Sequence, residues 1–146
     1  MLDMRLKSLF FDRQAVERAV DKAKRQVLSR AGALVRTAAR TSIRPRRGTS
    51  APGQPPYSHV GLLRRLILFG YDRQSDSVVI GPVRLHKPGS APHVLEFGGT
   101  TIMEEWRGGR RRRRRVRVRA RPYMGPALAR ERDKLPALWS GSVRGG

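Results

Sequence analysis

The sequence between Asp12 and Ala39 repeats apolar residues at spacings of three and four, which is the period of an α-helix. Asp12 is a suitable N-cap residue, and the basic residues become denser toward Arg40, which complements the helix dipole. The pattern predicts one long helix over residues 12–41. At ~1.5 Å per residue the periodic part spans roughly 40 Å, more than a small domain covers. We therefore expect part of its apolar stripe to meet another chain.

The next segment, residues 44–58, contains four prolines and two glycines. Proline removes backbone donors and glycine permits turn geometries, so neither a helix nor a central strand can continue here. The composition predicts a long exposed loop. It is either a flexible linker or an arm that becomes ordered on a neighbouring molecule.

Residues 60–121 alternate between short apolar runs and turn residues, which is typical of strands. A helical turn is expected at Val60 before an apolar strand that reaches Phe69, and a second strand from Ser77 is closed by Gly81 and Pro82. His93–Phe97 is either helical or extended. Residues 100–106 and 115–121 are expected to be strands joined through Gly108 and Gly109. The second strand alternates strictly, which predicts one face with Val116, Val118 and Ala120 and the other with Arg115, Arg117, Arg119 and Arg121.

A closing helix is predicted over residues 126–139, with Pro136 expected to kink or end it. The order of elements indicates a single α+β domain over residues 1–146. In this fold a long N-terminal helix and a C-terminal helix pack on an antiparallel β-sheet. A Pro/Gly-rich loop and an Arg-rich hairpin at residues 107–121 complete the domain.

The chain of 146 residues carries 32 Lys and Arg against 11 Asp and Glu, a formal net charge of +21. Soluble monomers usually carry a net charge of roughly 2 to 8 in magnitude, so a polyanionic partner or a tight assembly is expected. Ten of the basic residues fall within residues 107–121. Arginine pairs bidentately with phosphate and carboxylate. The candidate contacts to an anion or partner are Arg110, Arg111, Arg112, Arg113, Arg114, Arg115, Arg117 and Arg119.

This arginine run has two interpretations. It is either a hairpin that contacts nucleic acid or an acidic protein, or a solvated loop tip with a compositional bias. It contains no interleaved aromatic residue, and the chain has no helix-turn-helix, zinc-finger or RNP pattern. Any contact with nucleic acid is therefore expected to be dominated by phosphates and sensitive to salt.

The sequence offers few groups for catalysis. It has no cysteine, and its three histidines (His59, His86 and His93) lack the spacing of a helical metal pair. Glu104 and Glu105 are neighbours on an expected strand, so they should point to opposite faces and offset nearby arginines. Phosphate-binding loops and nucleophile elbows are also missing. We expect no enzyme, no metal site and no cofactor.

No stretch approaches the roughly 20 apolar residues of a membrane span. Met1–Phe11 is interrupted by Asp3, Arg5 and Lys7, so it is not expected to be a signal peptide. The sequence therefore predicts no association with a membrane.

Four sequence pieces, in this order, resemble the neck and tail-completion proteins of tailed bacteriophages. They are APGQPPYSHVGLLRRLI from Ala51, VIGPV from Val79, APHVLEFGGT from Ala91 and RPYMGPAL from Arg121. The matching positions have structural roles at turns and helix starts, with no catalytic pattern. These positions are Gly61, Leu62, Gly81, Pro82, Glu96, Phe97, Gly98, Arg121, Pro122 and Tyr123.

The resemblance implies a structural virion protein, assembled in the host cytoplasm, that forms a homo-oligomeric ring at the head-tail junction. Such rings are commonly hexamers, and they join the connector or stopper to the tail tube while DNA passes through. Whether the chain is a neck protein, a tail terminator or a stopper stays open.

The arginine run is not part of the family pattern, so two partners are open for it. One is the phosphate backbone of genomic DNA in the channel, and the other is an acidic adjoining ring. Tightly bound arginines would slow the exit of DNA, which favours the protein. The alternative function is a nonspecific nucleic-acid-binding protein that contacts phosphates.

Overall fold

The longest element is a single helix along which the other elements pack. The computed structural model describes residues 12–83 and 91–143. The helix α1 runs over Arg13–Ser42, about 45 Å at 1.5 Å per residue. The Asp12 carboxylate accepts a hydrogen bond from the backbone N–H of Ala15 at 2.9 Å and caps the first turn. The predicted long helix and its N-cap are confirmed.

Two separate ribbons of antiparallel strands accompany the helices. The elements after α1 are α2 (Leu62–Leu66), β1 (Ile67–Asp72), β2 (Ser77–Pro82), α3 (Ala91–Phe97), β3 (Gly99–Arg107), β4 (Arg110–Val118) and α4 (Met124–Glu131). The strand β1 pairs with β2, and β3 pairs with β4. This arrangement confirms the predicted α+β class.

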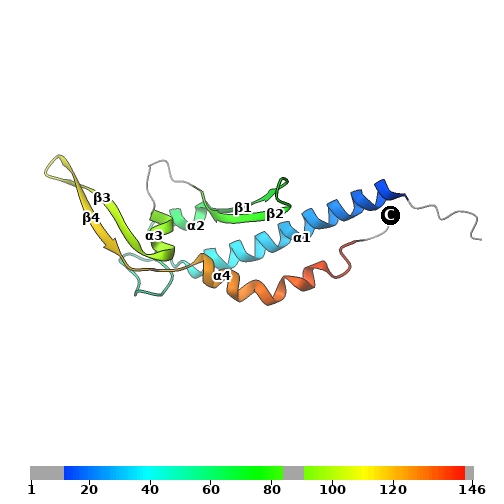
Figure 1. Ribbon diagram of the computed structural model, residues 1–146. Coiled ribbons are helices and arrows are strands. Elements are labelled where there is room, and N and C mark those ends of the chain that lie inside the picture. Colours follow the sequence, from blue (N-terminus) through cyan, green and yellow to red (C-terminus); the bar gives the residue numbers. More distant parts are fainter. Residues whose placement is uncertain (1–11, 84–90, 144–146) are drawn as a thin grey trace, which may run out of the picture.

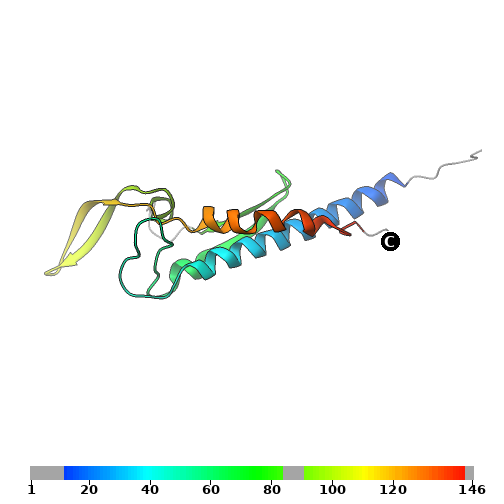
Figure 2. The same cartoon turned by 90° about the horizontal axis from the view of Figure 1, so that it is seen from below.

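The helix α1 lies between α4 and the β1–β2 ribbon (Figure 1). The view from below shows α4 running back along α1, toward the end of the molecule where α1 begins (Figure 2). The β3–β4 hairpin extends away from the opposite end of α1. The molecule is therefore elongated, with its arginine-rich strand at one extremity.

The C-terminal helix is shorter than the sequence predicts. It begins at Met124 instead of residue 126 and ends at Glu131. Two 3-10 turns, Arg132–Lys134 and Pro136–Trp139, follow it. Pro136 has no N–H to donate to the carbonyl of Arg132, and its ring would clash with that carbonyl in an α-helix. The α-helix has already ended before Pro136 is reached, so the expectation that Pro136 kinks or ends it is wrong, and Pro136 instead begins the second 3-10 turn.

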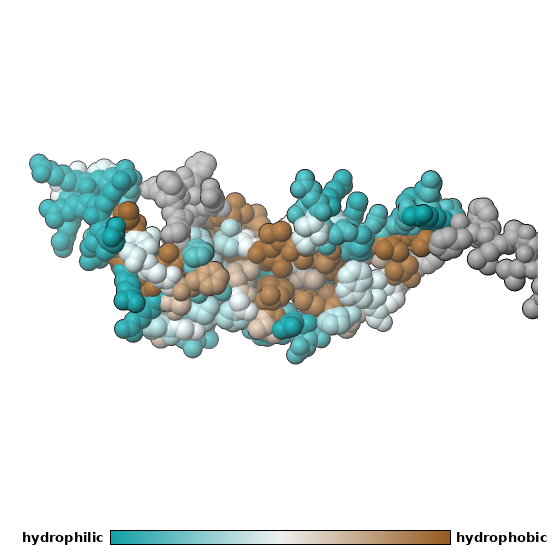
Figure 3. Space-filling model, in the orientation of Figure 1, coloured by the Kyte–Doolittle hydropathy of each residue, from teal (hydrophilic) through white to brown (hydrophobic). Residues whose placement is uncertain are grey.

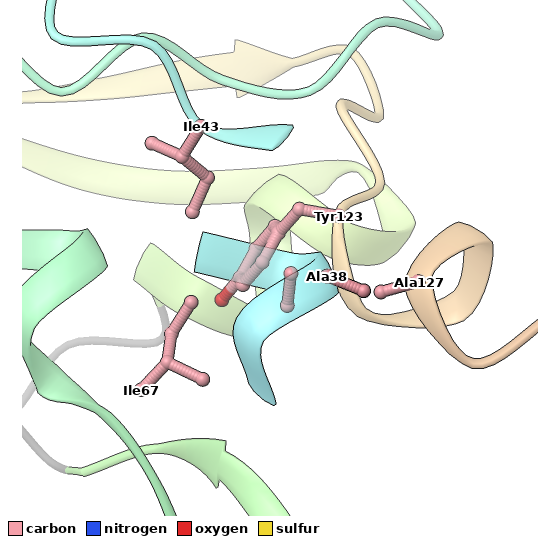
Figure 4. Close-up of a cluster of buried hydrophobic side chains, with 6 residues drawn as sticks. Ala38, Ile43, Ile67, Tyr123 and Ala127 are labelled. Atoms are coloured by element: carbon pink, nitrogen blue, oxygen red, sulfur yellow. The ribbon is translucent and has the colours of Figure 1, made fainter. Parts of the chain in front are cut away.

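The main buried cluster forms where the end of α1, the start of β1 and the start of α4 meet (Figure 4). Half of its members are alanines, which let the backbones approach closely but supply little apolar volume. The members are Ala38, Ala39, Ile43, Ile67, Tyr123 and Ala127. Among the described residues this cluster therefore buries little apolar volume.

The β1–β2 ribbon packs against the backbone of α1 at Gly32. A Cβ atom on Gly32 would lie 2.7 Å from the ring of Phe69 and 2.8 Å from a methyl group of Val78. Any side chain at this position would push the ribbon away from the helix. Glycine in mid-helix is therefore explained by a close contact between two elements.

The loop over residues 44–58 is attached to its own chain at several points. A parallel bridge joins Arg44 to Tyr57, and the N–H of Gly53 donates to the carbonyl of Ala120 at 2.9 Å. Ser50 and Pro56 are buried, whereas most of the loop is exposed as predicted. The sequence allowed a flexible linker or an arm ordered on a neighbour, and neither interpretation included this internal attachment.

Candidate functional site

The arginine run forms the second strand of a regular hairpin. Gly108 and Gly109 both have positive φ angles, 57° and 72°, which a tight two-residue turn requires. The turn sets the register so that Arg107 lies opposite Arg110 and Gly99 lies opposite Val118. The six consecutive arginines thus belong to β4. They are exposed to solvent, but they lie on a strand and not in a loop, because the turn lies before Arg110.

The strand was expected over residues 115–121, but it is shifted toward the N-terminus. It starts at Arg110 because the turn at Gly108 and Gly109 is so short. It ends at Val118, opposite the first residue of β3. Within the strand the predicted alternation is confirmed, because Val116 and Val118 are half-buried while the arginines beside them are exposed.

Arg119 is exposed, whereas Arg121 is half-buried and engaged by the loop over residues 44–58. The Nε of Arg121 donates to the carbonyl of Ser50 at 2.9 Å, and its backbone N–H donates to the carbonyl of Leu95 at 2.6 Å. Arg121 was expected on the same strand face as Arg115, Arg117 and Arg119. That expectation is wrong, because the chain leaves the ladder after Val118.

Two glutamates of β3 neutralise part of the hairpin. The carboxylate of Glu104 pairs with Arg111 and with Arg113, the latter at 3.0 Å between Oε1 and Nε. Glu105 pairs with Arg114 at 3.5 Å. The hydrogen bond from Arg111 is the main reason why the pKa of Glu104 lies below its ordinary value. The expectation that these two glutamates face opposite sides and offset arginines is confirmed.

Four arginines of β4 have no such partner. Within residues 12–83 and 91–143, no carboxylate lies within salt-bridge distance of Arg110, Arg112, Arg115 or Arg117. All four are exposed. Their charge is available to a ligand, and on the face that the space-filling view shows, the outer end of the hairpin is mostly hydrophilic (Figure 3).

An aromatic residue that sequence reasoning missed lies beside the arginines. Trp106 is 76% exposed and lies directly across the ladder from Arg111. Ile102, 61% exposed, is on the same face opposite Arg115. The arginine run itself has no interleaved aromatic residue, but the neighbouring strand supplies one. The signal in the sequence was the Gly108–Gly109 turn, which fixes this register.

Glu96 holds the start of α4. Its Oε2 accepts hydrogen bonds from the backbone N–H groups of Tyr123 at 2.9 Å and Met124 at 3.0 Å, and its Oε1 accepts from Gly125 at 2.7 Å. The first N–H groups of a helix have no partner within the helix, so a carboxylate there both satisfies them and complements the dipole. The resemblance pieces that contain Glu96 and Tyr123 are therefore in direct contact.

Gly98 is the point where the base of the hairpin meets α3. Its φ of +75° disfavours a side chain, and a Cβ would lie 3.1 Å from the backbone nitrogen of Ala120.

Tyr123 is 1% exposed, and burial raises the pKa of its phenol to about 12. Phe97 is 71% exposed and lies next to the ring of His93. Pro122 is half-buried.

The remaining resemblance positions lie at the entry to α2 and the end of β2. Gly61, at φ +70°, is the residue before α2, and Leu62 at its start is exposed. Gly81 and Pro82 end β2, as predicted, and lie opposite Leu68 and Ile67. These four positions are therefore separate from the contacts that Glu96 makes, and the resemblance positions do not form a single site.

No group of three or more His, Asp or Glu side chains among the described residues could hold a metal ion. His86 and the segment Met1–Phe11 lie outside the described residues. Over the same described ranges, no helix combines the length and the apolar character needed to cross a membrane.

Comparisons with models of protein families, with curated proteins and with solved structures found no match for this chain.

Proposed function

We propose that this chain is a structural subunit of a homo-oligomeric ring at the head-tail junction of a tailed bacteriophage. The ring joins the capsid connector or stopper to the tail tube and lets DNA pass. The bacteriophage assignment comes from the four ordered sequence pieces. The assembly assignment comes from an apolar surface that a single copy leaves uncovered.

One observation carries the assembly proposal, namely that one stripe of α1 is buried at one end and exposed at the other. Ala23 and Val27 are each 2% exposed, whereas Val20 and Val16, one and two turns earlier on the same face, are 39% and 44% exposed. Neighbouring residues of α1 and the C-terminal turn line a groove of about 660 Å³ beside this exposed part. The apolar pattern is the same along this face of α1, but one half of the face is buried and the other half is exposed. This is expected where a second copy covers the exposed half.

The β1–β2 ribbon offers a second uncovered surface. Its outward face carries Leu68, 44% exposed, and Val79, 62% exposed, next to Gly70 and Gly81. Neither strand pairs with a third among the described residues. A two-stranded ribbon leaves unpaired backbone groups along both of its edges, and pairing with another copy satisfies them. A stable interface buries at least about 1,000 Å², which the valines of α1 alone cannot supply.

The experiment is negative-stain microscopy of the purified protein, alone and mixed with tail tubes. Samples at about 0.1 M and about 0.5 M salt are compared, because salt screens the repulsion between copies of charge +21. Rings are expected, in larger numbers at the higher salt concentration. A protein that stays monomeric at both salt concentrations and with tail tubes contradicts the proposal.

A further inference from the structure

The β3–β4 hairpin is positively charged on both of its faces. The register places four arginines and one glutamate on each side of the ribbon. One face carries Arg111, Arg113, Arg115 and Arg117 with Glu104, and the other carries Arg107, Arg110, Arg112 and Arg114 with Glu105. We infer that this hairpin is an arm that binds duplex DNA by lying in a groove, where each arginine face meets the phosphates of one strand.

Charge on both faces favours duplex DNA over an acidic protein. A protein surface would cover one face and leave the four arginines of the other face repelling one another. A DNA groove has a row of phosphates on each side, so it neutralises both faces at once. The major groove is ~12 Å wide and admits a two-stranded β-ribbon.

The dimensions and attachment of the hairpin also suit this role. Strands of nine residues extend about 30 Å at ~3.3 Å per residue, which is close to one helical turn of DNA. The base is fixed by the contact of Gly98 with Ala120 and by the hydrogen bonds of Arg121. The arm therefore projects from a defined support (Figure 1).

The side chains are available for the contact. Arg110, Arg112, Arg115 and Arg117 are exposed and have no carboxylate within salt-bridge distance in the described part of the chain. Arginine pairs with phosphate through two parallel hydrogen bonds. Trp106 near the tip and Met103 in the middle of β3, 76% and 45% exposed, add apolar surface, and proteins that bind the minor groove insert such residues between base steps.

The test measures binding of a fluorescently labelled duplex of roughly 24 base pairs, and of one of its strands, between about 0.1 M and 0.3 M salt. The first variant replaces Arg110, Arg112, Arg115 and Arg117 with alanine. The control variant makes the same charge change at four exposed positions elsewhere, namely Arg25, Arg65, Arg73 and Arg132. Circular dichroism checks that both variants keep their helices.

The hairpin variant is expected to bind the duplex at least about 30-fold more weakly at the lower salt concentration. The slope of log affinity against log salt should fall by about 3 to 4, one for each lost phosphate contact. The control variant should lose less than about threefold with its slope unchanged, since its arginines lie outside the contact. The unmodified protein should bind duplex more tightly than single strand.

Three results would overturn the inference. One is an equal loss of affinity in both variants, since general charge would then explain the binding. Another is equal affinity for duplex and single strand. The third is tighter binding to polyglutamate than to duplex DNA at equal salt, which would favour an acidic protein partner.

A second measurement covers the case in which the alanine variant disturbs the hairpin. Trp106 and Trp139 are the two tryptophans of the chain, so Trp139→Phe leaves Trp106 as the only fluorescent tryptophan. Duplex DNA is expected to quench or shift its emission. Unchanged emission at saturating DNA would contradict the inference. The hairpin needs no ring to bind DNA, so these assays and the microscopy can fail independently.

Discussion

At the scale of single residues, the positions that matter most are those where a side chain serves a distant part of the chain. Glu96 is a half-buried residue of α3, yet it satisfies three N–H groups at the start of α4. Ser50 presents its carbonyl to Arg121, while its own buried hydroxyl has no hydrogen-bond partner in the described structure. Both contacts connect segments that are far apart in the sequence.

Glu96→Gln is expected to destabilise the fold by about 1 to 3 kcal/mol. The amide presents an NH₂ group to backbone donors, and it loses the charge that complements the start of α4. Urea unfolding followed by circular dichroism measures the change. Glu105→Gln, on the exposed hairpin, is the matched control and should shift the free energy of unfolding by less than about 0.5 kcal/mol. Equal shifts would show that the cap contributes nothing.

Gly98→Ala is expected to cost about 2 to 3 kcal/mol, because it combines a left-handed backbone with a close contact to Ala120. The control is Gly48→Ala. Gly48 also has a positive φ, +89°, but open space surrounds its Cβ position. The control should cost only about 1 kcal/mol. Thermal unfolding of both variants separates the steric contribution from the conformational one, and identical losses would rule out the contact.

At the scale of elements, the β3–β4 hairpin depends on two carboxylates to offset its arginines. The pKa of Glu104 is lowered chiefly by its hydrogen bond with Arg111. A carboxyl group with a lowered pKa in the folded state stabilises that state above its unfolded pKa, which is near 4.5. This contribution is lost as the pH falls through the lower, folded value.

We therefore expect the hairpin to loosen below about pH 4.5, with the change complete only under more acidic conditions. The emission of Trp106 in the Trp139→Phe background reports the change. Adding Glu104→Gln should remove this transition, because the amide does not titrate. A transition of the same size and midpoint in that variant would assign it to another group.

At the scale of the whole molecule, the long helix α1 packs against the β1–β2 ribbon and against α4, but it is longer than either of them. The β1–β2 ribbon and α4 cover opposite sides of α1, and Val16 and Val20 remain exposed near its first turns. Hydrophobic surface gathers over the middle of the molecule and toward this end (Figure 3). The charged hairpin lies at the other end.

Val16→Asp is expected to reduce ring formation without unfolding the subunit. Aspartate near the start of a helix complements the dipole, but it cannot be buried against another copy without cost. Val60→Asp makes the same change at a residue that is 74% exposed in the loop before α2, and it should leave assembly intact. Sedimentation velocity and microscopy compare the two variants. Normal rings from Val16→Asp would remove this stripe from the interface.

The sequence by itself determined the features that depend on local periodicity and turn chemistry. The spacing of apolar residues defined α1, Asp12 identified its cap, and Gly81 and Pro82 marked the end of β2. A two-residue turn at Gly108 and Gly109 also fixes the register that places Trp106 opposite Arg111. These features depend on interactions between residues that are close in the chain.

Tertiary structure determined the contacts between segments that are far apart in the sequence. The strands could have formed one sheet, and only packing determined that β1–β2 lies on Gly32 while β3–β4 projects alone. No local pattern encodes the hydrogen bonds of Glu96 at the start of α4, or the hydrogen bond from Arg121 to the carbonyl of Ser50. Most importantly, the pairing of β4 with β3 placed arginines on both faces of a ribbon. The net charge of +21 gave the amount of charge, but only the fold determined where it is presented.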